Sequence, residues 1–166
     1  MRNKKLRSLT LGATVAALYV LLTWLAGIFG LASGAVQLRL SEMLCVLPIF
    51  FPSAIPGLYV GCLIANLLNN AVMWDVVFGS LATLIGALGT YALRRRPYLS
   101  LIPPILANTV IVPFVLVLGY GLPFTVPSVL LSALTVCIGE ALSCGVLGVF
   151  LMKIVKKYLP NLNEMG

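Results

Sequence analysis

Histidine is absent from this chain, and only four of its 166 residues are acidic. The sequence also contains no GxxxxGK[ST] loop, no GxSxG turn and no HExxH motif, so it has no recognisable route to ATP hydrolysis, serine-hydrolase chemistry or zinc catalysis. The four cysteines form no CxxC pair and lie inside apolar runs, where cysteine usually acts as a small packing residue. We therefore predict a protein that is not an enzyme and that needs neither a metal nor another cofactor.

Charged residues of either sign are scarce, and most of the chain is apolar. The chain is 61% hydrophobic and 9% charged, with a mean hydropathy of +1.10, far outside the composition of soluble domains. The prediction is an all-α integral membrane protein with a single transmembrane domain over residues 1–166. Its six helices are expected at 9–30, 36–52, 57–70, 75–93, 99–118 and 128–155.

Ten of the eleven basic residues fall into three clusters: the N-terminus, Arg94–Arg96, and the set Lys153, Lys156 and Lys157. Lysine and arginine beside apolar spans mark the cytoplasmic side of a membrane. The clusters therefore predict a multi-pass protein of the cell membrane with both termini in the cytoplasm, and the net charge of +7 is explained without nucleic acid. A cleavable signal peptide is the alternative for the N-terminus, but the apolar run is too long for one.

A polar stretch, Gln37–Glu42, interrupts the apolar pattern before the second span. We expect it to form the mouth of a small-molecule pocket, with Gln37 and Glu42 touching the ligand and Arg39 orienting a carboxylate. A surface ion pair between Arg39 and Glu42, worth about 0–1 kcal/mol, is the alternative. Ser41 is a plausible N-cap, which would put Glu42 in the first turn of the helix.

Further polar residues lie at the predicted outer ends of the third and fourth spans. Asn66, Asn69 and Asn70 end the third span on one helical face. Asp75 begins the fourth, either as a ligand contact or as a helix cap. Trp74 could stack on a planar ligand, or could belong to the aromatic belt of the membrane interface.

Glu140 lies about twelve residues into the sixth predicted span, near the middle of the bilayer. A charge at that depth costs about 2.5–3.5 kcal/mol on insertion scales, so the side chain is expected to face the interior of the bundle. It is either a functional group or a glutamate that pins helices together. Asn108, halfway along the fifth span, is a further candidate for ligand contact.

Small residues crowd the first span. Gly12, Ala13, Ala16 and Ala17 form two overlapping pairs with a spacing of four, which lets another helix approach closely. The pattern fits docking of a separate protein and internal packing equally well.

Three stretches, Gln37–Leu44, Gly57–Asn66 and Asp75–Leu84, resemble the QueT family of queuosine-precursor transporters, and the similarity extends over nearly the whole chain. The resemblance implies a substrate-binding S component of an energy-coupling factor (ECF) transporter, with a six-helix fold and a site open to the outside. It further implies a deazaguanine base as substrate and, as partners, a transmembrane coupling subunit and two cytoplasmic ATPase subunits. Ala13 and Ala17 match the alanine pattern by which S components dock to the coupling subunit.

The residues alone also allow another function. A small autonomous transporter could export cationic compounds in exchange for protons, with Glu140 as the titrating group.

Overall fold

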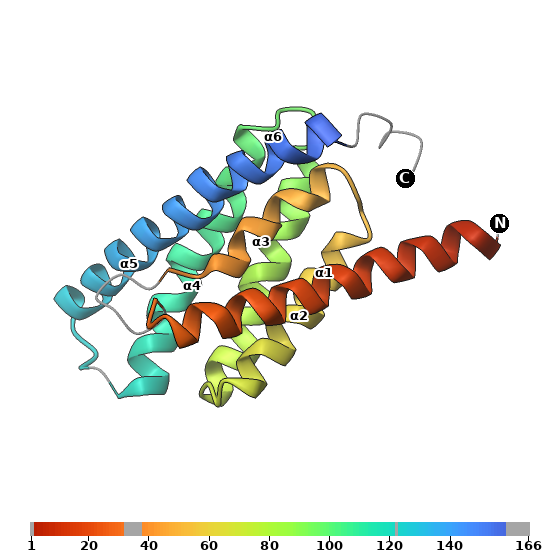
Figure 1. The fold of residues 1–166 in the computed structure, drawn as a ribbon. Coiled ribbons are helices and arrows are strands. Elements are labelled where there is room, and N and C mark those ends of the chain that lie inside the picture. Colours follow the sequence, from red (N-terminus) through yellow and green to blue (C-terminus); the bar gives the residue numbers. More distant parts are fainter. Residues whose placement is uncertain (1, 32–37, 122, 159–166) are drawn as a thin grey trace.

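The computed structural model describes residues 2–31, 38–121 and 123–158 of the chain. Every regular element within those ranges is a helix, which confirms the predicted all-α class. The α-helices are α1 (Arg2–Ile28), α2 (Ala54–Leu68), α3 (Ser80–Ala92), α4 (Ile102–Tyr120), α5 (Val126–Glu140) and α6 (Gly148–Tyr158) (Figure 1).

Four irregular helices join or extend these segments. Two are 3-10 helices, η1 (Leu40–Ile49) and η3 (Leu99–Leu101), and two are π-helical turns, η2 (Asp75–Gly79) and η4 (Ala141–Leu147). Because η2 runs into α3, η3 runs into α4, and η4 joins α5 to α6, the described residues form six helical segments, as the apolar runs predicted.

Four of the segments are long and apolar enough to cross a membrane: Asn3–Ile28, Asp75–Ala92, Leu99–Tyr120 and Val126–Tyr158. The other two, Leu40–Ile49 and Ala54–Leu68, are shorter. At about 2.0 Å per residue in a 3-10 helix and 1.5 Å in an α-helix, each reaches only about 20 Å, less than the thickness of the hydrocarbon core. Full crossing by these two segments stays a prediction.

The short segment η1 lies at the centre of the molecule. Seven of its ten residues are buried, and α1, α3, η4 and α6 surround it. Ten residues is long for a 3-10 helix, and Pro48 inside it lacks the N–H that an α-helical turn would use. With three residues per turn, Glu42, Cys45 and Pro48 share one face of η1.

Small residues set how closely α1 approaches α2. A Cβ atom added to Gly61 would lie 2.9 Å from the Cα of Ala16, and Gly57 lies against the Gly12 carbonyl one turn away. Gly12 and Ala16 therefore contact α2, in agreement with the internal packing considered for these small residues, and both are half-buried. Ala13 and Ala17 are exposed.

The basic clusters gather at one end of the bundle. The N-terminal turns of α1, the turn after α3 that carries Arg94–Arg96, and the end of α6 all lie toward the upper right in Figure 1. The turn between α2 and η2 and the connection from α4 to α5 lie at the other end. This arrangement agrees with a positive-inside topology, although the orientation in the cell stays a prediction.

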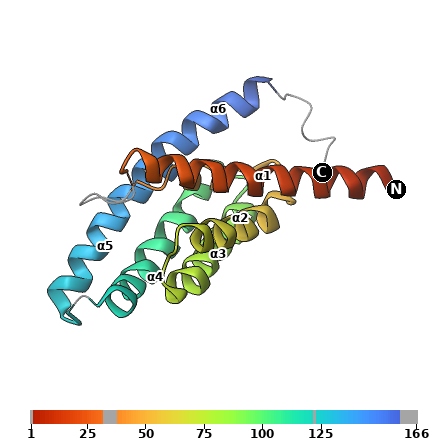
Figure 2. The ribbon, with the colours of Figure 1, turned by 60° about the horizontal axis from the view of Figure 1, so that its bottom comes forward.

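Helix α1 is the least embedded segment. It lies across one face of the molecule, and its first turns, residues 3–10, extend past the other helices and are exposed (Figures 1 and 2). A long apolar helix with one open face is suited to contact with lipid or with another protein.

Candidate functional site

A polar cavity of about 570 Å³ opens at the end of the bundle away from the basic clusters. Its size is typical of small-molecule sites. It is formed where α1 ends, η1 begins, α2 turns into η2 and α4 ends. We call it the outer pocket, and its lining residues are Tyr19, Thr23, Ala26, Gly27, Leu38, Arg39, Ser41, Asn66, Asn69, Asn70, Ala71, Asp75, Leu116 and Tyr120.

The charged pair of the outer pocket is Arg39 with Asp75. Nη2 of Arg39 lies 3.4 Å from Oδ2 and 3.5 Å from Oδ1 of Asp75, and the two side chains are 19% and 8% exposed. Both distances are long for hydrogen bonds and use only one guanidinium nitrogen. The remaining N–H groups of Arg39 are thus suited to bind a ligand.

This pairing corrects two expectations from the sequence. Arg39 does not pair with Glu42, because its backbone (φ −89°, ψ 88°) lies outside the helix and its side chain reaches η2 instead. Asp75 pairs with Arg39 and does not cap its helix, which has no side-chain cap. Ser41 is not a cap either; its hydroxyl accepts a hydrogen bond of 2.9 Å from Thr23 and ties η1 to α1.

Glu42 points into the bundle, beneath the pocket. It is fully buried, and its carboxylate accepts hydrogen bonds from the Tyr19 hydroxyl, from Sγ of Cys45 (3.0 Å) and from Oγ1 of Thr83 (3.3 Å). A buried carboxylate requires such donors. Tyr19 and Ser41 stand between it and the cavity, so Glu42 supports the pocket floor and is absent from the lining.

Backbone groups of η1 and η2 are also held by side chains. Sγ of Cys144, on η4, donates to the carbonyl of Glu42 (3.1 Å), and Nδ2 of Asn66 donates to the carbonyl of Asp75 (3.0 Å). The two acidic residues of the pocket region are therefore positioned through their backbones as well as their side chains.

The three asparagines all line the outer pocket, but in different ways. Asn66 is buried, whereas Asn69 and Asn70 are exposed. Asn69 bonds the carbonyl of Ala65 (2.9 Å). Asn70 lies beyond the end of α2 with a φ of 52°, a left-handed conformation that asparagine tolerates. A turn, and not one helical face, brings Asn70 to the cavity.

Trp74 does not line the outer pocket. The indole of Trp74 stacks on Phe78 (centroids 5.6 Å apart, planes at 16°), is half exposed, and lies outside the lining. Gln37 lies outside the described residues.

Asn108 and Glu140 lie deeper in the bundle, outside the lining of the cavity. They are 0% and 3% exposed; Glu140 faces the bundle interior as expected, whereas the ligand contact expected of Asn108 stays a prediction. In the described part of the chain, Oε2 of Glu140 and both amide atoms of Asn108 have no hydrogen-bond partner.

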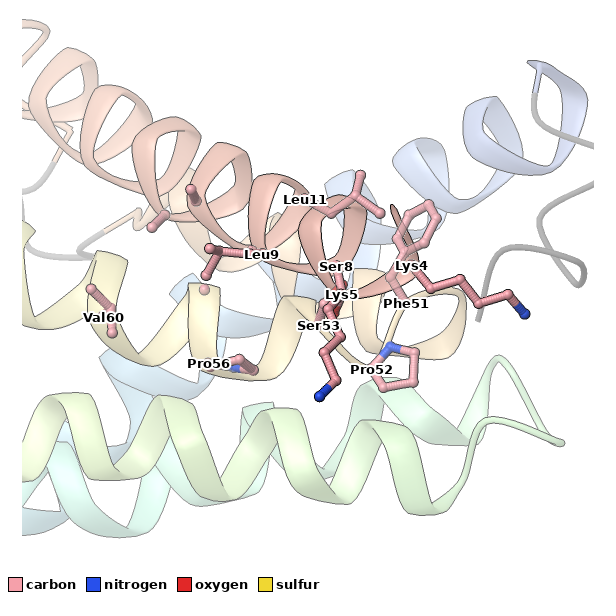
Figure 3. A pocket seen from close by; sticks show the side chains of 14 residues that line it. Lys4, Lys5, Ser8, Leu9, Leu11, Phe51, Pro52, Ser53, Pro56 and Val60 are labelled. Atoms are coloured by element: carbon pink, nitrogen blue, oxygen red, sulfur yellow. The ribbon is translucent and has the colours of Figure 1, made fainter. Parts of the chain in front are cut away.

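A second cavity, of about 700 Å³, lies at the basic end between α1 and the segment that leads into α2. Lys4 and Lys5 extend beside Pro52 at its rim (Figure 3). Gly12, Ala13 and Ala16 are among its lining residues. Because these side chains are small, they leave α1 and α2 with a hollowed apolar surface here, which we call the α1 groove.

Sequence reasoning missed the residues that hold the pocket floor. Tyr19 and Thr23 lie within the first apolar span and were not selected as candidates. Their spacing of four, which puts both polar groups on one face of α1, was the available signal. Thr83 gave no signal of its own, since a lone threonine in a helix commonly bonds its own backbone, as it also does here with the carbonyl of Gly79 (3.2 Å).

The described residues form helices only, four of them of membrane-spanning length, with a pocket that polar side chains line, and this is the architecture expected of a multi-pass membrane transporter. The profile of the QueT transporter family matches residues 9–157, and the chain belongs to this family. QueT is a family of transporters and not of enzymes.

The chain is also similar to a queuosine precursor transporter, QueT, of Lactococcus lactis subsp. cremoris. The two are 38% identical over 85 residues, which make up 51% of this chain and 50% of that protein. The chain therefore aligns with about half the length of this curated relative. No solved structure matches it.

Proposed function

We propose that this protein is the substrate-binding S component of an ATP-driven ECF importer and that it captures a queuosine precursor, a deazaguanine base, from outside the cell. The observation that carries the proposal is the outer pocket, where Arg39, Asp75 and three asparagines converge in an otherwise apolar helical bundle. Membership of the QueT family and the name of the relative support the substrate.

The chemistry of the pocket fits such a base. Carboxylate and amide oxygens accept hydrogen bonds from adjacent N–H groups like those on the edge of a guanine ring, and the amide and guanidinium N–H groups match its carbonyl. The phenol ring of Tyr120 is an apolar face on which a planar ligand can stack.

The partners are a transmembrane coupling subunit and two cytoplasmic ATPases, since the chain has no ATP-binding motif of its own. The exposed Ala13 and Ala17 and the adjoining α1 groove are the docking surface for the coupling subunit. After binding, the loaded subunit topples in the membrane when the ATPases act on the coupling protein.

Binding of deazaguanine bases to the purified protein, followed by calorimetry, tests the substrate. We expect saturable binding that Asp75→Asn weakens by about tenfold or more, because the variant leaves Arg39 without its counter-charge and removes a charged acceptor. If the purified protein binds a vitamin and shows no binding of these bases, the assignment of a deazaguanine substrate is wrong.

Docking has its own test. Ala13→Trp or Ala17→Trp should abolish transport and assembly with the coupling subunit while leaving substrate binding intact, because both positions are exposed. Gly61→Leu is the matched comparison, since it disrupts the internal contact with α1 and should impair folding itself. Loss of binding in the Ala13 and Ala17 variants would mean that these residues support the bundle.

A second candidate function is autonomous transport coupled to protons, which the buried and incompletely bonded Glu140 favours. Vesicles that contain this chain alone would then accumulate or expel substrate, and Glu140→Gln would stop transport. Transport that requires the coupling subunit and ATPases excludes this alternative.

A further inference from the structure

The α1 groove joins an apolar surface to a basic rim. Within the described residues its lining is apolar except for Lys4, Lys5, Ser8 and Ser53, and no acidic side chain is part of it. Lys4, Lys5 and Ser8 belong to the first turns of α1, and Ser53 directly precedes α2. The polar residues therefore gather at the end of the bundle where the basic clusters lie.

Positive charge at this end of the groove comes from two sources. Lys4 and Lys5 are exposed and extend beside Pro52 (Figure 3). The N-terminus of α2, which begins at Ala54, adds the positive end of a helix dipole. Because no carboxylate in the described lining neutralises these charges, the rim is suited to an anion.

The rest of the groove runs along α1 over the depth of one membrane leaflet. It extends from Lys4 to Ala16, about 18 Å along the helix. Half of the hydrocarbon core of a bilayer is about 15 Å thick. A lipid chain whose headgroup lies at the lysines therefore reaches the deep end of the groove.

The apolar part of the groove is open at its edges. Leu9 on α1 and Val60 on α2 are 71% and 44% exposed, and Ala13 is exposed as well. Such a surface favours an apolar occupant, because covering apolar area is favourable. An occupant with an apolar chain and an anionic end matches both parts of the groove.

We propose that the α1 groove binds one anionic phospholipid of the cytoplasmic leaflet. The phosphate lies at Lys4 and Lys5, and an acyl chain follows the small residues Gly12, Ala13 and Ala16 along α1. Basic pockets between helices on the cytoplasmic side are suited to anionic headgroups. A zwitterionic headgroup brings its own cation and gains less from the lysines.

The lipid occupies the surface on which the proposed coupling subunit docks. The free subunit therefore holds the lipid, which covers apolar residues such as Leu9, and the lipid leaves when the coupling subunit takes its place. Lipid binding itself does not depend on the ECF assignment, since the lysines and the groove belong to this chain alone. The two proposals can thus fail independently.

Native mass spectrometry of the purified full-length protein in detergent tests the proposal. Phosphatidylglycerol is compared with phosphatidylcholine of the same acyl chains, so that only the headgroup differs. The wild type should bind one phosphatidylglycerol at least about tenfold more tightly, because each lysine near an anionic headgroup contributes about fivefold. Equal affinity for the two lipids would overturn the proposal.

Lys4→Gln combined with Lys5→Gln should reduce the affinity for phosphatidylglycerol to about that for phosphatidylcholine and leave the latter nearly unchanged. The matched control is Lys153→Gln with Lys156→Gln, which removes the same charge from exposed positions of α6 outside the groove. This control should retain the preference for phosphatidylglycerol. An equal loss in both double variants would mean that the lipid responds only to the net charge of this end of the bundle, and the proposed site would be wrong.

Ala13→Trp tests the apolar part of the groove. The indole would fill the space beside α1, and the variant should weaken binding of both lipids by about tenfold or more. Unchanged lipid binding in this variant would place the acyl chain elsewhere. Glycerol phosphate that competes as strongly as the whole lipid would reduce the groove to an anion site. Either result overturns the proposal, and neither bears on substrate binding at the outer pocket.

Discussion

Acidic side chains occur both at the outer pocket and at the buried contact between α4 and the end of α5, but their hydrogen bonding differs. Asp75 in the pocket has Arg39 as its partner, and Glu42 under the pocket floor has donors from three helices. Glu140 has an oxygen without any donor in the described residues. A carboxylate that is already satisfied stabilises the fold, whereas one left unsatisfied is available to a ligand.

This difference has a physical origin in the elements that carry the acids. Glu42 lies on the central η1, where α1 and α3 bring hydroxyl groups to it. Glu140 ends α5 near Asn108 of α4, and within the described part of the chain neither amide atom of Asn108 has a hydrogen-bond partner.

The largest expected effect on stability comes from removing the Glu42 carboxylate. Glu42→Leu should lower the free energy of unfolding by about 3 kcal/mol, because the Tyr19 hydroxyl and its neighbours lose their acceptor in a buried site. Thermal denaturation in detergent measures the loss. Glu42→Gln, which keeps one acceptor oxygen, is the matched control and should lose less; equal losses would show that the hydrogen bonds to Glu42 are unimportant.

A smaller effect on stability is expected from the ion pair of Arg39 and Asp75 at the outer pocket. A double-mutant cycle with Arg39→Met and Asp75→Asn should yield a coupling of about 1 kcal/mol, since the contact is long and partly exposed. The same cycle should show a larger coupling in substrate affinity than in stability. No coupling in either measurement would mean that the pair neither holds the pocket nor orients the ligand.

Glu140→Leu provides the sharpest contrast with Glu42→Leu. Without substrate, the variant should be as stable as the wild type or more stable by about 1 kcal/mol, since it removes an incompletely bonded polar group from the interior. Denaturation in detergent compares the two proteins directly. A loss as large as that of Glu42→Leu would place Glu140 among the structural residues.

The smallest effect belongs to the stacked tryptophan outside the pocket. Trp74→Ala should change substrate affinity by less than about threefold, because the indole packs on Phe78 and lies outside the lining. Tyr120→Ala, on the pocket wall, is the comparison and should weaken binding more. A strong effect of Trp74→Ala would place the indole against the bound ligand.

The sequence by itself determined the class of this protein. Long apolar runs define the helices, because a lipid environment requires every backbone group to be bonded within its own segment. Scarce charges in such runs marked Arg39, Glu42, Asp75 and Glu140 as candidates for function. These four residues stand out because so few charges lie outside the basic clusters. The basic clusters themselves distinguish one end of the bundle from the other.

Only the tertiary structure decided which of these residues meet. Arg39 and Asp75 are 36 positions apart and Tyr19 and Glu42 are 23 apart, so no helical or strand period relates them. The same holds for the small residues of α1, where packing against Gly57 and Gly61 turns Gly12 and Ala16 inward and leaves Ala13 and Ala17 exposed. Local periodicity predicts faces of helices, whereas the choice of partner for each face follows from how all six segments fill the same space.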